Sequence, residues 1–145
     1  MKVLRGKVAV ITGGASGIGR SVAERAAAEG MKVVLADIEE SPLNLTAGAL
    51  ESSGAEVEAV VADVSNGSDV EALRDRALER FGAVHLVHNN AGVGVGGLLW
   101  TVPAADWKWI LGVNLWGSST GSGRSSRCWS SRARVTLSTR HLWPA

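Results

Sequence analysis

The stretch that decides the fold is Thr12-Gly13-Gly14-Ala15-Ser16-Gly17-Ile18-Gly19, a glycine-rich turn between two regular segments. Residues 8–11 before it form an uninterrupted apolar run, which predicts a strand buried on both faces. Apolar residues then recur at helical spacing over residues 20–29. A strand, a glycine turn and a helix predict a phosphate site, because the first N–H groups of a helix lack intrahelical partners and attract anions. An ordinary strand-to-helix turn is the alternative.

The pattern repeats along the chain. Further strands are predicted over residues 32–36, 57–62 and 84–87, with helices over 43–53 and 68–81 between them. Strands that alternate with helices of this length predict an α/β protein with a parallel sheet covered on both faces. Ligands of such sheets bind beyond the carboxyl ends of the strands, and polar or glycine-rich loops follow all four predicted strands.

Asp37 is the polar residue at the end of the second predicted strand, 18 residues beyond Gly19. A carboxylate at this place can accept both ribose hydroxyls of an adenosine, and it repels a 2′-phosphate. No basic residue stands at Ser16 or directly after Asp37 to attract that phosphate. The sequence therefore favours NAD(H) over NADP(H). The alternative for Asp37 is a solvated loop acid beside Glu39 and Glu40.

Five motifs in this order resemble the short-chain dehydrogenase/reductase family over residues 6 to 117. They are Thr12-Gly-x-x-x-Gly17-x-Gly19, Asp37, Asp63-Val64, Asn89-Asn90-Ala91-Gly92 and Val113-Asn114-Leu115. The resemblance implies a Rossmann-type, doubly wound parallel sheet, here incomplete, with strands one to four and their helices. It also implies hydride transfer between a nicotinamide and an alcohol or carbonyl.

The resemblance further implies a role for individual residues. The turn over residues 13–19 is implied to hold the pyrophosphate, Asp37 the adenosine ribose, and Asp63 with Val64 the adenine. Asn114 matches the helix asparagine that supports the proton relay of the family. The cofactor-binding residues implied in this way are Gly13, Ser16, Gly17, Ile18, Gly19, Asp37, Ile38, Asp63, Val64, Asn90, Ala91 and Gly92.

The proton-transfer residues of the family have no counterpart in this chain. Family members carry a catalytic serine after the fifth strand, then a tyrosine with a lysine four residues further on. The chain contains no tyrosine, and its last lysine is Lys108. We therefore expect a family member by descent that is catalytically incomplete. A non-catalytic dinucleotide-binding fragment is the alternative.

The composition changes after Gly117. Residues 1–117 have a net charge of −4, whereas residues 118–145 contain five arginines and no acidic residue, giving +5. We expect a partial dinucleotide-binding domain over 1–117 and a non-native or disordered Ser/Arg-rich tail over 118–145.

Suitable synonymous codons let residues 118–124, read one base earlier, encode Val-Ile-His-Gly-Val-Arg-Ala, an ordinary continuation of the family's helix. We therefore hypothesise a frameshift after Gly117, with truncation at a chance stop codon. A nucleic-acid-binding arm is the alternative, but the tail contains no lysine and begins abruptly.

The missing segments have consequences for association. The fourth strand is expected to be an unpaired edge, which invites aggregation. Helical spacing of Trp107, Ile110, Leu111 and Leu115 predicts a core-facing stripe. Without the later strands, the helix surfaces over residues 107–116 are expected to lie open. The intact family member is expected to form a homo-oligomer.

Composition limits the remaining function classes. The single cysteine, Cys128, excludes an intrachain disulfide and is typical of the cytoplasm. No apolar run is long enough to span a bilayer, so no membrane partner is expected. His85 and His88 lie three apart on a predicted strand and face opposite sides, so no metal is expected. We expect a small-molecule alcohol or carbonyl substrate for the full-length family and no nucleic acid.

Overall fold

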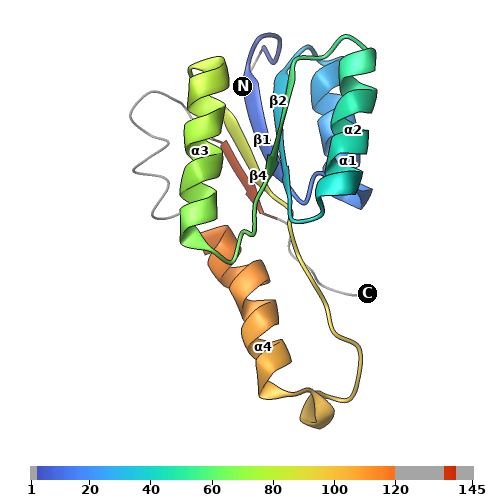
Figure 1. Cartoon of the computed structure of the whole chain (residues 1–145), viewed down its shortest axis with the longest axis vertical. Coiled ribbons are helices and arrows are strands. Elements are labelled where there is room, and N and C mark those ends of the chain that lie inside the picture. Colours follow the sequence, from blue (N-terminus) through green and yellow to red (C-terminus); the bar gives the residue numbers. More distant parts are fainter. Residues whose placement is uncertain (1–2, 120–135, 140–145) are drawn as a thin grey trace.

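The computed structural model describes residues 3–119 and 136–139 of the chain (Figure 1). Strands and helices alternate along it, as the sequence predicts. The elements are β1 (Val8–Thr12), α1 (Gly17–Ala28), β2 (Lys32–Asp37), α2 (Glu40–Ser52), β3 (Val57–Val61), α3 (Gly67–Phe81), β4 (Leu86–Asn89), the 3-10 turn η1 (Leu99–Thr101), α4 (Ala104–Leu111), the π-helical segment η2 (Gly112–Gly117) and β5 (Thr136–Thr139).

The strands form one parallel sheet in the order β3-β2-β1-β4-β5. The chain builds outward from β1 to β3 and then returns to place β4 on the other side of β1. This reversal between β1 and β4 is the topological switch point at which open α/β sheets bind ligands. The predicted Rossmann-type sheet is confirmed.

Helices cover both faces of the sheet, with α1 and α2 on one side and α3 on the other (Figure 1). Strand β1 shows why its sequence does not alternate between apolar and polar residues. Ala9 and Ile11 pack toward α1 and α2, whereas Val8 and Val10 pack toward α3, and all four are 2% exposed or less. A strand enclosed on both faces needs apolar side chains at every position.

The prediction that β4 is an unpaired edge strand is wrong. Thr136–Thr139 pairs with it in parallel as β5, with Leu86 opposite Thr136 and Asn89 opposite Thr139. The strand satisfies backbone N–H and C=O groups that β4 would otherwise leave open, and threonine is typical of strands. Four residues of the expected tail therefore belong to the sheet. The rest of that tail beyond residue 119 lies outside the described residues.

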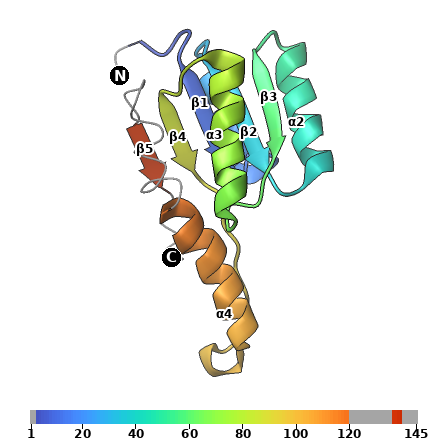
Figure 2. The same ribbon diagram turned by 60° about the vertical axis from the view of Figure 1, so that its left-hand side comes forward.

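A segment that we call the α4 arm, residues 93–117, extends away from the carboxyl edge of the sheet (Figures 1 and 2). Its helix α4 has no buried residue, and Trp107 is 40% exposed. The core-facing stripe predicted here is not buried in the structure, which agrees with the expectation that these surfaces lie open. The reason is that no described element packs over them. No helix within the described part of the chain is long and apolar enough to cross a membrane.

Candidate functional site

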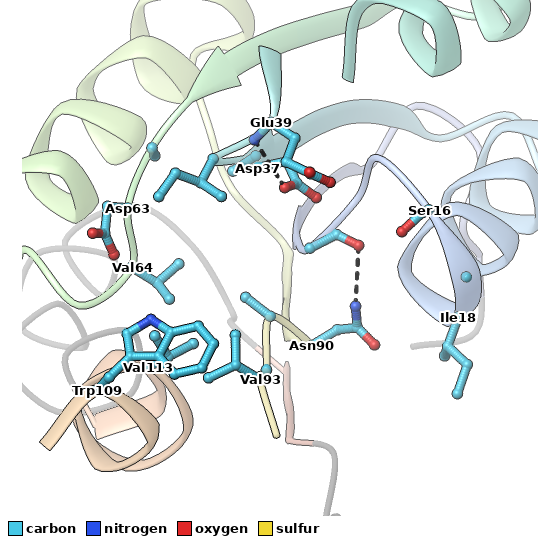
Figure 3. Close-up of a pocket in the computed structure, with 17 residues that line it drawn as sticks. Ser16, Ile18, Asp37, Glu39, Asp63, Val64, Asn90, Val93, Trp109 and Val113 are labelled. Carbon is cyan, nitrogen blue, oxygen red and sulfur yellow. Dashed lines mark hydrogen bonds between the residues drawn. The ribbon is translucent and has the colours of Figure 1, made fainter. Parts of the chain in front are cut away.

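A cavity of about 410 Å³ lies at the carboxyl edge of the sheet, where the four predicted loops meet (Figure 3). All predicted cofactor-binding residues except Gly19 line it. The position follows from the parallel sheet, since the carboxyl ends of parallel strands meet at the same edge. The lining residues are Gly13, Ser16, Gly17, Ile18, Ala36, Asp37, Ile38, Glu39, Ala62, Asp63, Val64, Asn90, Ala91, Gly92, Val93, Trp109 and Val113.

Helix α1 begins inside the glycine turn, at Gly17, and not after it as the apolar spacing predicts. The first helical hydrogen bond runs from the Arg20 N–H to the Ser16 carbonyl at 3.1 Å. The N–H groups of Gly17, Ile18 and Gly19 precede that bond and therefore have no intrahelical acceptor. The Ser16 side chain makes no capping hydrogen bond. This end of the cavity thus offers N–H groups, a hydroxyl and the positive end of a helix dipole to an anion.

Two glycines of the turn are required by close packing. At Gly13, φ is +64°, and a Cβ would lie 2.9 Å from the Cα of Ala91. At Gly19, a Cβ would lie 2.0 Å from the Gly13 carbonyl oxygen and 2.6 Å from Nδ2 of Asn90. Gly19 therefore lets α1 approach the turn from β1, which explains why it supports the cavity without lining it.

The carboxylate of Asp37 is fixed by two backbone groups. Oδ2 accepts a hydrogen bond from the Ala15 N–H at 3.0 Å, and Oδ1 accepts one from the Glu39 N–H at 3.2 Å. The carbonyl of Ala15 is held in turn by the buried Thr46 hydroxyl, which donates to it at 2.9 Å. The carboxylate is therefore locked to the glycine turn. Each oxygen keeps lone pairs for further donors, such as sugar hydroxyls.

Thr12 and Asn90 connect the loop after β1 to the loop after β4. The Thr12 hydroxyl accepts hydrogen bonds from the N–H groups of Asn90 and Ala91 at 3.0 and 3.1 Å. Nδ2 of Asn90 donates to the carbonyls of Thr12 and Gly13 at 3.1 and 3.2 Å. The amide orientation is thereby fixed, since both partners are acceptors. Oδ1 of Asn90 is buried beside the cavity and has no partner among the described residues, which leaves it able to accept a donor from a ligand or a water.

The far end of the cavity combines a carboxylate with apolar side chains. Oδ1 of Asp63 accepts hydrogen bonds from the backbone N–H and the hydroxyl of Ser65 at 2.9 and 2.7 Å. Val64 follows directly and lies beside Trp109 and Val113 in Figure 3. This end therefore has the mixed character of a pocket for a flat, partly polar group.

The sequence reasoning missed several lining residues. Ala36, Ala62 and Glu39 adjoin predicted residues on the loops, so they follow from the strand ends. Val93, Trp109 and Val113 come from the α4 arm, whose approach to the cavity the sequence motifs do not indicate. One feature of the sequence could have linked two of them: Trp109 and Val113 are four residues apart, so they share a helix face.

Asn114 does not line the cavity. Its side-chain amide instead bonds to both backbone groups of Val93: Oδ1 accepts from the N–H at 2.8 Å, and Nδ2 donates to the carbonyl at 2.8 Å. Asn114 therefore fixes the base of the α4 arm, where the chain leaves the sheet. A role in proton relay stays a prediction.

The comparisons with known proteins agree with this architecture. A sequence model of the family described as "short chain dehydrogenase" matches residues 7–134. The chain belongs to this family.

Among curated relatives, the CLA biosynthesis dehydrogenase/reductase of Lactiplantibacillus plantarum is 43% identical over 115 residues, 79% of this chain and 40% of that protein. The 3beta-hydroxysteroid dehydrogenase 2 of Eggerthella lenta is 41% identical over 115 residues, 78% of this chain and 44% of that protein. The chain thus spans less than half the length of these relatives.

Solved structures give the same picture. A short chain dehydrogenase/reductase from Burkholderia phymatum, in complex with NAD, superposes with a TM-score of 0.86 at 53% identity. The match covers 89% of this chain and 46% of that one. A 3-ketoacyl-(acyl-carrier-protein) reductase from Brucella melitensis, complexed with NADH, gives a TM-score of 0.79 at 36% identity, over 84% of this chain and 50% of that one.

Proposed function

We propose that this chain carries the NAD(H)-binding part of a dehydrogenase that transfers hydride between a nicotinamide and a small-molecule alcohol or carbonyl. One observation carries the proposal: the Asp37 carboxylate is fixed to the same turn whose helix end faces the cavity. A dinucleotide needs an anion site and a ribose acceptor side by side. The turn and Asp37 provide both.

The lining residues divide into groups that suit the parts of a dinucleotide. The N–H groups of residues 17–19 and the Ser16 hydroxyl would hold the pyrophosphate, and Asp37 would accept the adenosine ribose hydroxyls. Asp63 and Val64 would contact the adenine, and residues 90–92 would form the floor of the site. The nicotinamide, when bound, supplies the hydride acceptor or donor.

NAD(H) is proposed over NADP(H) because of charge. The Asp37 carboxylate would repel a 2′-phosphate at the ribose it binds. Glu39 lines the same part of the cavity and adds a second acidic group, whereas no lysine or arginine among the described residues lines the cavity. A 2′-phosphate would therefore meet two carboxylates and no counter-charge.

We further propose that this chain binds the cofactor without turnover. It has no tyrosine to exchange a proton with the substrate oxygen, and the described cavity contains no histidine or lysine that could replace it. The alternative is a fragment whose natural role is dinucleotide binding alone. The site geometry is the same for such a fragment and for a truncated enzyme. The two differ only in the reading frame of the gene after Gly117.

The gene therefore distinguishes these two possibilities. With synonymous codons chosen to suit, residues 136–139 can be read in the shifted frame as His-Ile-Val-Asn, which is apolar at its centre and falls on β5. The genetic code therefore permits a frameshift after Gly117 but does not require one. If the natural codons past Gly117 yield no family-like text in the shifted frame, the frameshift is excluded.

Other expectations extend this proposal to the intact protein. We propose that a full-length family member of this lineage forms a homo-oligomer in the cytoplasm and that the present chain aggregates through its open arm. The exposed tryptophans of that arm support the second point.

The test combines binding with turnover. NADH and NADPH fluorescence titrations of the chain should give tighter binding of NADH, and a panel of secondary alcohols with NAD should produce no absorbance change at 340 nm. Alcohol-dependent NADH formation would overturn the claim of incompleteness. Equal affinity for NADPH would overturn the cofactor preference.

A further inference from the structure

Trp109 has a large apolar side chain that belongs to neither hydrophobic core of the described residues. It belongs to α4, which has no buried residue, and it is 50% exposed. Unlike Trp100, Trp107 and Trp116, it lines the cavity at the sheet edge. An aromatic side chain held at a cavity wall, without a packing role elsewhere, is available to contact a ligand.

The position of Trp109 within the cavity indicates which part of a ligand it meets. In Figure 3 the indole lies beside Val64 and Val113, near Asp63, whereas Ser16 and Ile18 at the helix end lie on the opposite side. Asp37 lies between these two ends. A ligand with its phosphates at α1 and its ribose at Asp37 would therefore direct its base toward Trp109.

We propose that Trp109 is an adenine-binding residue and forms an aromatic wall at the base end of the cavity. This inference rests on the proposed dinucleotide site. Every base has a flat π-face, and aromatic side chains stack on such faces. The indole N–H is a donor only, and adenine ring nitrogens are acceptors, so an edge contact is also favourable. Val64 and Val113 complete an apolar slot around the ring.

The α4 arm is fixed where it leaves the sheet, and this gives the aromatic wall a defined place. The two hydrogen bonds between Asn114 and Val93 join the ends of the arm next to the cavity. Val113, four residues beyond Trp109 on the helix, is only 8% exposed and anchors that face of the helix at the sheet edge. The backbone that carries Trp109 is thus placed at the cavity before a ligand binds, which limits the entropy lost on binding.

The test compares the whole chain with Trp109→Leu and Trp109→Phe by calorimetric titration with NADH, AMP and the reduced nicotinamide mononucleotide. Trp107→Leu is the matched control, because Trp107 lies on the same helix, is 40% exposed and does not line the cavity. Circular dichroism of each variant checks that the fold is retained, as expected for a half-exposed residue.

We expect Trp109→Leu to weaken NADH and AMP binding by about fivefold or more, the lower end of base stacking. Trp109→Phe should retain most of the affinity, and Trp107→Leu should change it less than twofold. Unchanged AMP affinity in Trp109→Leu would overturn the inference, and so would a loss confined to the nicotinamide mononucleotide, which would place the indole at the other end of the cofactor. If the parent chain is folded but binds neither NADH nor AMP, the proposed function itself fails and this inference fails with it.

Discussion

The carboxyl rim of the sheet and the α4 arm are adjacent in space but differ in how their side chains are satisfied. At the rim, Thr12, Thr46 and Asn90 are buried, at most 7% exposed, and their hydrogen bonds join the loops after β1 and β4 and helix α2. On the arm, Trp100 is 81% exposed and Trp116 is 61% exposed. Polar side chains at the rim are buried and hydrogen-bonded, with Oδ1 of Asn90 as an exception, whereas these two tryptophans of the arm are largely exposed.

The difference shows which part of the fold is self-sufficient. The rim is built from β1, β2, β4 and their loops, and every bond that fixes Asp37 and the glycine turn lies within residues 12–91. The arm presents an apolar surface that no described element covers. Among the described residues, the hydrogen bonds that shape the candidate site are thus internal to the rim, whereas the apolar surface of the arm is open.

Gly19→Ala should have the largest effect, because its Cβ would lie 2.0 Å from the Gly13 carbonyl oxygen. Backbone cannot move aside as a flexible side chain can, so we expect the unfolding free energy to fall by about 3 kcal/mol or more. NADH binding should be lost as well. Urea unfolding measures it. Gly48→Ala in α2 is the control, since nothing lies within 4 Å of its Cβ and it should stabilise the chain slightly. Equal effects of the two substitutions would contradict the close packing of the turn.

Asp37→Asn tests the rim by charge. The substitution keeps the side-chain shape but removes the negative charge, and hydrogen bonds to charged groups contribute about 1.5–3 kcal/mol. We expect NADH affinity to fall about tenfold or more, with a smaller loss or a gain for NADPH, in fluorescence titrations. Asp106→Asn, in the first turn of α4 and outside the cavity, should leave both affinities unchanged. If the ratio of NADH affinity to NADPH affinity is the same in Asp37→Asn as in the parent chain, the proposed role of the carboxylate is refuted.

His85 makes the rim's supporting sheet sensitive to pH. Its Nδ1 accepts a hydrogen bond from the Val8 N–H at 3.1 Å, which only the neutral ring can do. Burial, and secondarily the positive charge of Lys7, lower the pKa of His85 below 6.5 in the folded chain. The unfolded chain therefore takes up this proton at higher pH than the folded one. The resulting stability is present above pH 6.5 and is lost as the pH falls through the lowered folded pKa.

The measurement is the urea midpoint between pH 7.5 and 5.5. His85→Asn supplies a non-titrating acceptor at a similar position and should reduce the pH dependence relative to the parent chain. Parallel pH profiles for the two proteins would show that His85 does not contribute.

Substitutions on the α4 arm should change the unfolding free energy least. Replacing Trp100 and Trp116 together by serine removes exposed side chains without core contacts, so the unfolding free energy should change by less than about 0.5 kcal/mol. Association should fall, as measured by sedimentation velocity. Leu73→Ala in the core is the contrast, with an expected cost of about 2–5 kcal/mol. A large stability loss from the two tryptophans would show that the arm is packed.

The parts that sequence alone could predict are those governed by local pattern. The uninterrupted apolar run of β1 and the glycines after it predict a buried strand, a turn and a helix, because each is a property of neighbouring residues. Parallel strands then bring Asp37, Asp63 and Asn90 to one edge by topology. The α1 start at Gly17 was missed because apolar spacing cannot register a helical turn made of glycines.

The parts that could not be predicted depend on long-range pairing. Whether β4 has a neighbour is decided by Thr136–Thr139, almost fifty residues away, in a Ser/Arg-rich segment that we expected to be disordered. Trp109 could not be assigned to the cavity from the sequence, because helical spacing gives the face that a residue shares and not the surface that covers it. Only the path of the α4 arm places it at the cavity.

Calorimetric titration of the whole chain with NADH, at neutral pH and without substrate, tests most directly whether the rim is complete for binding. We expect a saturable heat with one NADH bound per folded chain. A chain that is folded by circular dichroism but gives no binding heat at any temperature tested would contradict the proposal that the rim of this chain holds the cofactor.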